Sequence, residues 1–312
     1  MATIERIAWL SESEILEKLK TRPRVQGPVF VYSSQLGGWT DHVLGGLIGI
    51  DDHGFHRGDG VFEALRGVNR RPYLLREHFE RLQRSAQQLA IEVPLNLVDV
   101  GRVLAEGLAR FPDENTIVRL YLTRGPGGFS TSPAECVTPH FMAVIAGFVP
   151  PAKEKYAEGV RIGKSQVPVK VGWMATTKSL NYLPNVMMKR ESLERGLDFT
   201  VNYDSEGILA ESSTENIVVL RRDGVLCHPP LSGILKGCTM SRLFDLAEQK
   251  AVLPVQREVR LSEAQVLEAQ ALFMVGTTLD VLAVRQYESK SYKIHELSPV
   301  LRKLIQDDQT MI

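Results

Sequence analysis

The sequence predicts an α+β protein with two domains. The chain has 312 residues, against about 150 for a typical domain. Its strand-like runs cluster and its helical stretches stand apart, without the βαβ alternation of a doubly wound parallel sheet. Residues 149–156, VPPAKEKY, combine two prolines with charge and are typical of an interdomain linker. We expect an N-terminal domain over 1–148, with 1–25 as an extension, and a larger C-terminal domain over 157–312.

Hydrophobic periodicity and turn residues define the elements of the first half. In the helix expected at 76–90, the apolar Phe79, Leu82 and Leu89 lie on one side, which predicts a buried face. A polar turn ending at Pro72 separates two short strand-like runs. The expected helices are 11–20, 76–90 and 97–110, and the expected strands are 27–34, 60–68, 72–75, 116–125 and 140–148.

The second half begins with a strand and then brings several short strands together. We expect a β-meander between residues 199 and 229, because four apolar runs there are separated only by turn residues. The expected strands are 159–165, 199–203, 208–213, 216–222, 225–229, 253–260 and 271–277, and the expected helices are 183–195, 238–250 and a last one near 298–305.

Composition excludes several classes of protein. Hydrophobic residues make up 44% and charged residues 24%, as in ordinary globular proteins. Lys and Arg number 37, as do Asp and Glu, so no net charge attracts nucleic acid. No apolar run approaches the roughly 20 residues that cross a bilayer, and the N-terminus lacks the layout of a secretion signal. We expect a cytoplasmic protein without a membrane partner, whose three scattered cysteines are reduced.

Common catalytic and ligand motifs are missing. Neither glycine-rich nucleotide motif occurs, and no G-x-S-x-G motif supports a serine hydrolase. His53 and His56 lie beside Asp51 and Asp52, which are possible metal ligands. The glycines between and after them indicate a loop, and no third histidine follows at ligand spacing. We therefore expect no metal.

A second group of residues suits an aldehyde cofactor. Lys178 can form a Schiff base, and Glu211 can keep a pyridinium nitrogen protonated. Residues 233–239, GILKGCT, can bind a phosphate at a helix start, although an ordinary N-cap by Thr239 is the alternative. With Tyr182 and the 277–278 Thr pair, this is what pyridoxal phosphate requires. Spacing alone also allows a surface lysine, a core aromatic, a surface charge and a turn.

The sequence motifs around these residues resemble those of a known protein family. The ordered blocks are DDHGFHRGDGVFEALRG, REHFERLQRSA, TKSLNYLPNV, ILAESSTENIVVL and ILKGCTMSRL, closed by MVGTTLDV. They resemble the class IV (fold type IV) pyridoxal-phosphate aminotransferases, closest to the D-amino-acid transaminase-like and branched-chain members. The resemblance implies the two-domain fold of type IV, with pyridoxal 5'-phosphate between the domains, and a homodimer.

The resemblance also implies roles for residues that contact the cofactor ring. Lys178 matches the lysine that holds the cofactor as a Schiff base and later moves a proton of the substrate. Glu211 matches the carboxylate that faces the pyridine nitrogen. Tyr182 matches the tyrosine near the phenolic oxygen of the cofactor.

Further matches concern the phosphate and the substrate. Arg81 matches the arginine that binds the phosphate from the N-terminal domain, and Cys238, Thr239 and Thr277 match the remaining phosphate ligands. The turn at Thr277 and Thr278 matches the position that receives the substrate carboxylate.

Two other residues are candidates for the substrate pocket. Arg57 stands where many relatives have an aromatic residue, and its guanidinium could pair with a substrate carboxylate. It could equally face solvent or another subunit. Phe62 is either a pocket wall or part of the core. If Arg57 is in the pocket, Arg57→Leu should raise KM selectively for acidic substrates such as 2-oxoglutarate.

The resemblance leaves the substrate open. Gly127, Gly128 and Phe129 stand where bacterial D-amino-acid enzymes carry an Arg-x-His carboxylate trap. We expect amino transfer between a D-amino acid or branched-chain L-amino acid and a 2-oxo acid such as 2-oxoglutarate or pyruvate. The alternative is an aminodeoxychorismate lyase, which forms 4-aminobenzoate and pyruvate. A non-catalytic scaffold should have lost Lys178 or Glu211, and both are present.

Overall fold

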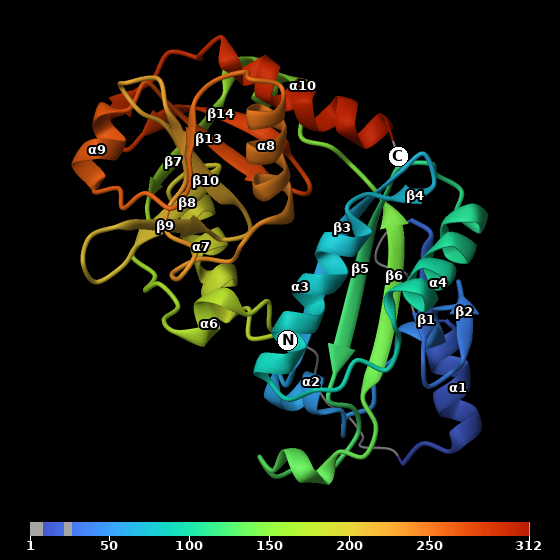
Figure 1. The fold of residues 1–312 in the computed structure, drawn as a ribbon. Helices are drawn as coiled ribbons and strands as arrows, with labels where there is room; N and C mark the ends of the chain where they lie inside the picture. The colour runs from blue at the N-terminus through green and yellow to red at the C-terminus, as the bar shows by residue number, and fades with distance from the viewer. Residues whose placement is uncertain (1–8, 22–26, 312) are drawn as a thin grey trace.

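The computed structural model describes residues 9–21 and 27–311 and has two lobes, each formed around its own sheet (Figure 1). Helices and strands mix without regular alternation, which confirms the α+β class. Residues 1–8 and 22–25 of the predicted N-terminal extension lie outside the described residues. Within 9–21 and 27–311, every helix is too short or too polar to cross a membrane.

The N-terminal lobe is formed around an antiparallel sheet of six strands in the order β2-β1-β6-β5-β3-β4. Two amphipathic helices, α3 and α4, bury their apolar residues against it. The strands are β1 Val29–Ser33, β2 Gly38–Thr40, β3 Gly60–Val68, β4 Arg71–Pro72, β5 Thr116–Thr123 and β6 His140–Gly147, and the helices are α3 Leu75–Gln88 and α4 Leu97–Arg110.

Helix α3 buries both apolar and charged side chains. Phe79, Leu82 and Ala86 are buried against the sheet, which confirms the face that the sequence predicts. Arg81 and His78 are also buried on α3, although charged groups are almost never fully buried unless they are paired. The burial of Arg81 and His78 is therefore not explained by packing on the sheet alone and indicates a further role for this part of α3.

The C-terminal lobe holds a mixed sheet of nine strands, in the order β12-β11-β10-β13-β14-β7-β8-β9, with β15 pairing to β14. Apolar clusters form two cores, one of which includes α8 and α10. The strands are β7 Val160–Lys164, β8 Phe199–Tyr203, β9 Leu209–Ser212, β10 Asn216–Leu220, β11 Leu226–Cys227, β12 Val255–Gln256, β13 Ala271–Gly276, β14 Asp280–Tyr287 and β15 Lys290–Ser291. The helices are α7 Leu183–Glu194, α8 Cys238–Gln249 and α10 Leu297–Thr310.

Shorter elements complete the chain. The predicted helix at 11–20 is confirmed as α1 Glu12–Lys20, which a capping box from Ser11 to Glu14 begins. The others are η1 Val43–Gly46, α2 His53–Arg57, η2 Pro133–Glu135, α5 Lys153–Glu158, α6 Trp173–Thr176 and α9 Glu263–Glu268.

Three predictions about the elements were wrong. The run 72–75 is not a strand: Asn69 and Arg70 have φ of 49° and 63° and make a two-residue hairpin turn, so pairing resumes at once in β4. The strand expected at 253–260 is confined to β12. The meander at 199–229 is interrupted, because β10 pairs with the distant β13 instead of β9. Sequence reasoning also missed α5, which begins within the expected linker 149–156, and β2, β14, β15, η1, η2, α2, α6 and α9.

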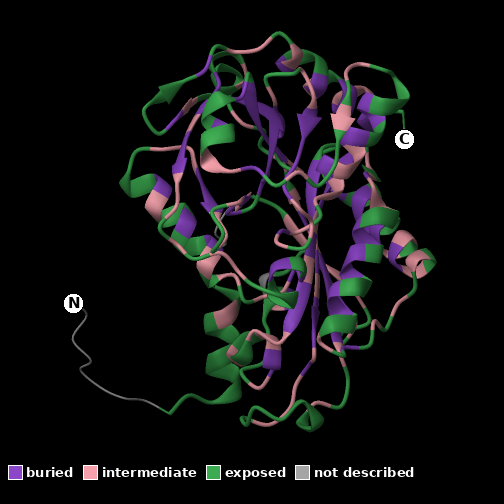
Figure 2. Cartoon of the chain, turned by 60° about the vertical axis from the view of Figure 1, so that its left-hand side comes forward, coloured by how far each residue is buried: buried purple, intermediate pink, exposed green. Residues whose placement is uncertain are grey.

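Contacts from the C-terminal helix join the lobes. Tyr73, just before α3, donates its hydroxyl to Asp308 of α10 at 2.7 Å, and Arg242 of α8 pairs with the same carboxylate. Arg81 of α3 donates to the Lys236 carbonyl oxygen at 2.8 Å. Buried residues concentrate in the two sheets and on the inner faces of the helices, while the outer helix faces are exposed (Figure 2).

Candidate functional site

A cavity of about 530 Å³ lies between the lobes. β3, α3 and β5 contribute its walls from the N-terminal lobe, and the loop before α7, the start of α8 and the end of β13 contribute from the C-terminal lobe. The structure brings nearly all predicted site residues together here. The lining includes Phe62, Arg81, Lys178, Tyr182, Glu211, Cys238, Thr239, Thr277 and Thr278.

Lys178 is held in the wall of this cavity by its own backbone. Its N–H donates to Ser85 Oγ at 3.1 Å, and its carbonyl oxygen accepts from the Phe62 N–H at 3.0 Å. The side-chain Nζ lies 4.5 Å from the centre of the Phe62 ring and 5.7 Å from that of Tyr182. Burial and the nearby positive charge of Arg81 lower the pKa of Lys178 to about 8. Its amine is therefore easier to deprotonate than an ordinary lysine.

Arg81 is anchored from below by a buried carboxylate. Its Nε and Nη2 each donate to Glu63 at 2.7 Å, and His78 Nδ1 donates to the same carboxylate at 2.7 Å. Burial alone would raise the pKa of Glu63, but Arg81 and His78 together bring it well below its usual range. The pair holds the guanidinium at the cavity wall with a fixed orientation.

The start of α8 lines the cavity close to Arg81, which donates to the Lys236 carbonyl oxygen two residues before this helix. Gly237 is the N-cap, and no side chain caps the first-turn amides. The alternative of an ordinary N-cap by Thr239 is therefore wrong, since Thr239 is a buried residue inside the helix. A Cβ at Gly237 would lie 1.9 Å from Asn216 Oδ1, so a larger residue there would displace the Asn216 side chain, whose Nδ2 donates to the Leu235 carbonyl oxygen. Free amides and a nearby arginine are a donor set that fits a phosphate.

Glu211 faces the cavity from β9. Its Oε2 accepts from the Leu235 N–H at 3.0 Å. Burial raises the pKa of Glu211 to about 7, opposed by Lys170, the Leu235 amide, Lys178 and Arg81. A carboxylate in such a place suits a positively charged ring nitrogen.

The aromatic rings of Tyr182 and Phe62 meet edge to face, with centroids 5.0 Å apart. Burial and the charge of Glu211 raise the pKa of Tyr182 well above its usual value, so its hydroxyl stays protonated and can donate a hydrogen bond. Phe62 lines the cavity, so its side chain is a pocket wall and not only core.

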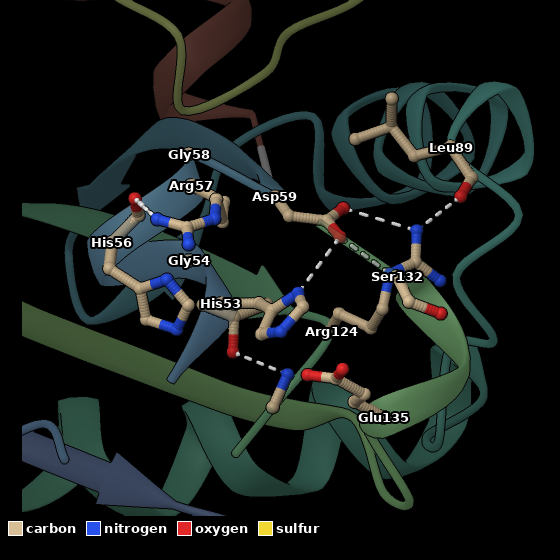
Figure 3. Close-up of polar contacts among 12 residues, drawn as sticks. His53, Gly54, His56, Arg57, Gly58, Asp59, Leu89, Arg124, Ser132 and Glu135 are labelled. Carbon is tan, nitrogen blue, oxygen red and sulfur yellow. Dashed lines mark hydrogen bonds and ion pairs between the residues drawn. The ribbon is translucent and has the colours of Figure 1, made fainter. Parts of the chain in front are cut away.

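Arg57 has another environment. It is absent from the cavity lining of this chain. Its guanidinium donates to the carbonyl oxygens of Ser130, at 3.2 Å, of His56, at 3.0 Å, and of Phe129. Figure 3 shows it beside His56, next to the Asp59–Arg124 ion pair. These contacts tie α2 to the loop after β5, and a role of Arg57 in substrate binding stays a prediction.

The histidines of this region also have structural contacts. His53 Nε2 donates to the Gly128 carbonyl oxygen at 3.0 Å. Its Nδ1 lies 3.7 Å from Asp59, a contact that Figure 3 shows. Among residues 9–21 and 27–311, no group of three or more His, Cys, Asp or Glu side chains is arranged to hold a metal.

Sequence reasoning missed several residues of the site. Arg119 and Tyr121 of β5 and Glu215 of β10 line the cavity, and Glu63 and His78 support Arg81. A signal for Arg119 and Tyr121 was present, because they alternate with apolar residues in the strand and must share one face. The pairing of Glu63 with Arg81 had no such signal, since it depends on how α3 packs on β3.

Comparison with known proteins gives the family. The family described as Amino-transferase class IV matches residues 60–287. The chain is 29% identical over 303 residues to the "D-amino-acid transaminase, chloroplastic" of Arabidopsis thaliana, and the match covers 95% of this chain and 80% of that protein.

Solved structures share the fold. The branched-chain aminotransferase of the thermophilic archaeon Thermoproteus uzoniensis, solved with norvaline, has a TM-score of 0.83 at 22% identity, covering 91% of this chain and 96% of that one. The 4-amino-4-deoxychorismate lyase of Pseudomonas aeruginosa has a TM-score of 0.74 at 25% identity, covering 84% and 95%. The family match spans most of the sequence, and its motif residues meet in one cavity. The chain therefore belongs to the class IV aminotransferases, which are enzymes that depend on pyridoxal phosphate.

Proposed function

We propose that this cavity binds pyridoxal 5'-phosphate and transfers an amino group between an amino acid and a 2-oxo acid. The observation that carries the proposal is the position of Lys178, a buried amine of lowered pKa that shares the cavity with Glu211 and Arg81. When bound, the cofactor supplies an electron sink for the bond that breaks at the substrate Cα.

The residues present fit that cofactor. Arg81 and the uncapped amides at the start of α8 would hold its phosphate, with the hydroxyl groups of Thr239 and Thr277 beside them. Glu211 would face the ring nitrogen, and its negative charge would favour the protonated form of that nitrogen. Tyr182 would donate its hydroxyl hydrogen to the phenolic oxygen.

Lys178 is the residue that would hold and move a proton. A base must spend part of its time neutral at working pH, and a pKa of about 8 allows this where an ordinary lysine would stay protonated. The rings of Phe62 and Tyr182 restrict where its Nζ can lie, so the amine would be held in a defined position within the cavity.

Arg119 is our candidate for binding a substrate carboxylate, together with Thr277 and Thr278. It lines the cavity and shares one face of the sheet with Tyr121. Both substrates of an amino transfer carry carboxylates, which guanidinium groups bind in two-point contacts. We propose a D-amino acid or a branched-chain L-amino acid as the donor, in line with the names of the relatives. The acceptor would be 2-oxoglutarate or pyruvate.

We further propose that the enzyme is a homodimer, as the family resemblance implies. Large apolar side chains are exposed along α6 and α7, with Trp173 at 52%, Leu183 at 69% and Val186 at 56% exposure. Contiguous exposed apolar surface is typical of an interaction site. Light scattering of the purified protein tests this, since a monomer at micromolar concentration would contradict it. The cytoplasmic location stays a prediction.

The test of function is a set of half-reactions. The protein loaded with pyridoxal phosphate is mixed in turn with L- and D-alanine, L-leucine, and D- and L-glutamate, and the absorbance of the cofactor is followed. Conversion to the pyridoxamine form by one group of donors gives the chirality and the side-chain class together. Pyruvate released from aminodeoxychorismate without any 2-oxo acid would instead identify the lyase. A protein that binds no pyridoxal phosphate would overturn the proposal.

A further inference from the structure

A small second cavity, the rear chamber, adjoins the main cavity at Glu211, Lys178 and Tyr182, which line both, and has a volume of about 20 Å³. Its walls include Lys170, Thr177, Asn185, Glu211 and Ser212. A site of roughly 10–15 Å³ or more can hold one water molecule if it offers two to four polar partners. The rear chamber therefore has the size for a single water.

Two buried polar atoms among these residues lack partners. Asn185 is 6% exposed and Ser212 is 2% exposed, and neither Asn185 Oδ1 nor Ser212 Oγ makes a hydrogen bond within the described part of the chain. The amide of Asn185 is oriented by its Nδ2, which donates to the Ser213 carbonyl oxygen, so Oδ1 is the free end. The nearby Ser212 hydroxyl lowers the pKa of the Glu215 carboxyl, but the two groups do not have the geometry of a hydrogen bond. A buried polar atom without a partner is unfavourable, so Asn185 Oδ1 needs a group that can donate a hydrogen bond to it.

Lys170 supplies the charge of the chamber. Its Nζ lies 5.8 Å from the centre of the Tyr182 ring. Within the described ranges, 9–21 and 27–311, it forms no ion pair with a carboxylate within 4.0 Å. It nevertheless shares the walls of the rear chamber with Glu211, and of an adjoining cavity of about 10 Å³ as well. A cation and a carboxylate that border one water-sized space without touching are separated by a distance that a water can bridge.

We propose that the rear chamber holds an ordered water that accepts a hydrogen bond from Lys170 and donates to Asn185 Oδ1 and to Glu211. Lys170 is then a positioning residue, which acts through this water and through its charge to keep Glu211 ionised. This rests on the proposed function, in which Glu211 faces the cofactor nitrogen.

The electrostatics agree with this role. Burial favours the neutral form of Glu211, and Lys170 is the first of the groups that oppose it, ahead of Lys178 and Arg81. Of these cations, Lys178 loses its charge near pH 8, and Arg81 is paired with Glu63. Lys170, by contrast, borders the rear chamber together with Glu211.

The test compares Lys170→Met with Lys170→Arg and with Lys153→Met, a control at an exposed helix position. The first readout is a crystal structure of the wild-type protein at a resolution that shows ordered water. The second is the pH dependence of the absorbance of bound pyridoxal phosphate, with its dissociation constant. Circular dichroism checks that each variant is folded.

The expected result is water density within hydrogen-bond distance of Asn185 Oδ1 and Glu211. The acidic transition of the cofactor band should move up by about one pH unit in Lys170→Met, roughly a tenfold change in the protonation constant, and return in Lys170→Arg. If the chamber is dry, or if Lys170→Met titrates like Lys153→Met, the inference is wrong. Failure of the proposed function differs from this, because the wild-type protein itself would then not bind the cofactor.

Discussion

The ion pair beneath Arg81 provides a quantitative test of how the site is held. Glu63 is fully buried and accepts three hydrogen bonds, two from Arg81 and one from His78, each at 2.7 Å. In Glu63→Gln the side chain keeps its size but loses its charge. The guanidinium of Arg81 then stays buried, with one neutral oxygen in place of a carboxylate.

The size of the effect follows from this burial. Removing one partner of a buried ion pair costs about 3–5 kcal/mol, because the other charge remains uncompensated. That is a large share of the roughly 5–15 kcal/mol by which a domain is typically stable. Since folding lowers the pKa of Glu63, its contribution is present above the ordinary value of 4.5 and is lost as the pH falls below it. The difference between Glu63→Gln and wild type should therefore shrink in acid.

The assay is urea unfolding of the cofactor-free protein, followed by near-UV circular dichroism at neutral pH. The matched control is Glu206→Gln, because Glu206 pairs with Arg260 at the surface, with side-chain exposures of 69% and 55%. An exposed pair contributes about 0–1 kcal/mol. If Glu63→Gln unfolds at the same urea concentration as Glu206→Gln, the reasoning about a buried anchor is refuted.

Three further results are expected. Lys178→Ala should abolish amino transfer while the circular dichroism spectrum is retained; full activity in this variant would reject Lys178 as the catalytic residue. The rate at which the cofactor-free protein captures pyridoxal phosphate can be measured by stopped-flow absorbance. It should fall about tenfold per pH unit below pH 8, because only the neutral amine attacks and the pKa of Lys178 is about 8. A rate that does not change between about pH 6 and pH 8 would contradict this. Arg119→Leu should raise KM for 2-oxoglutarate about tenfold or more, because a charge-assisted contact of about 1.5–3 kcal/mol is lost. The increase should be larger than in Arg57→Leu; the reverse order would indicate that Arg57, and not Arg119, binds the substrate carboxylate.

Much of the fold could be predicted because its elements are locally determined. The helices α1, α3 and α4 follow from the spacing of their apolar residues. The strand pairing of the C-terminal sheet had no such local signal. β10 pairs with β13, and the paired residues are 51 to 59 positions apart in the chain. Apolar runs such as 208–213 and 216–222 do not indicate which partner strand they take.

For the site, the sequence by itself determined which chemistry is available. The order of its motifs and the residues in them identified Lys178, Glu211, Arg81 and the start of α8 as candidate site residues. Only the tertiary structure decided which side chains serve that chemistry. In the folded chain Arg119 lines the cavity, and Arg57 donates hydrogen bonds to loop carbonyl oxygens instead. Glu63 accepts hydrogen bonds from Arg81 and fixes its orientation. The reason is physical, since a side chain's type is fixed by its own position in the sequence, whereas its neighbours, burial and pKa depend on how distant strands and helices pack.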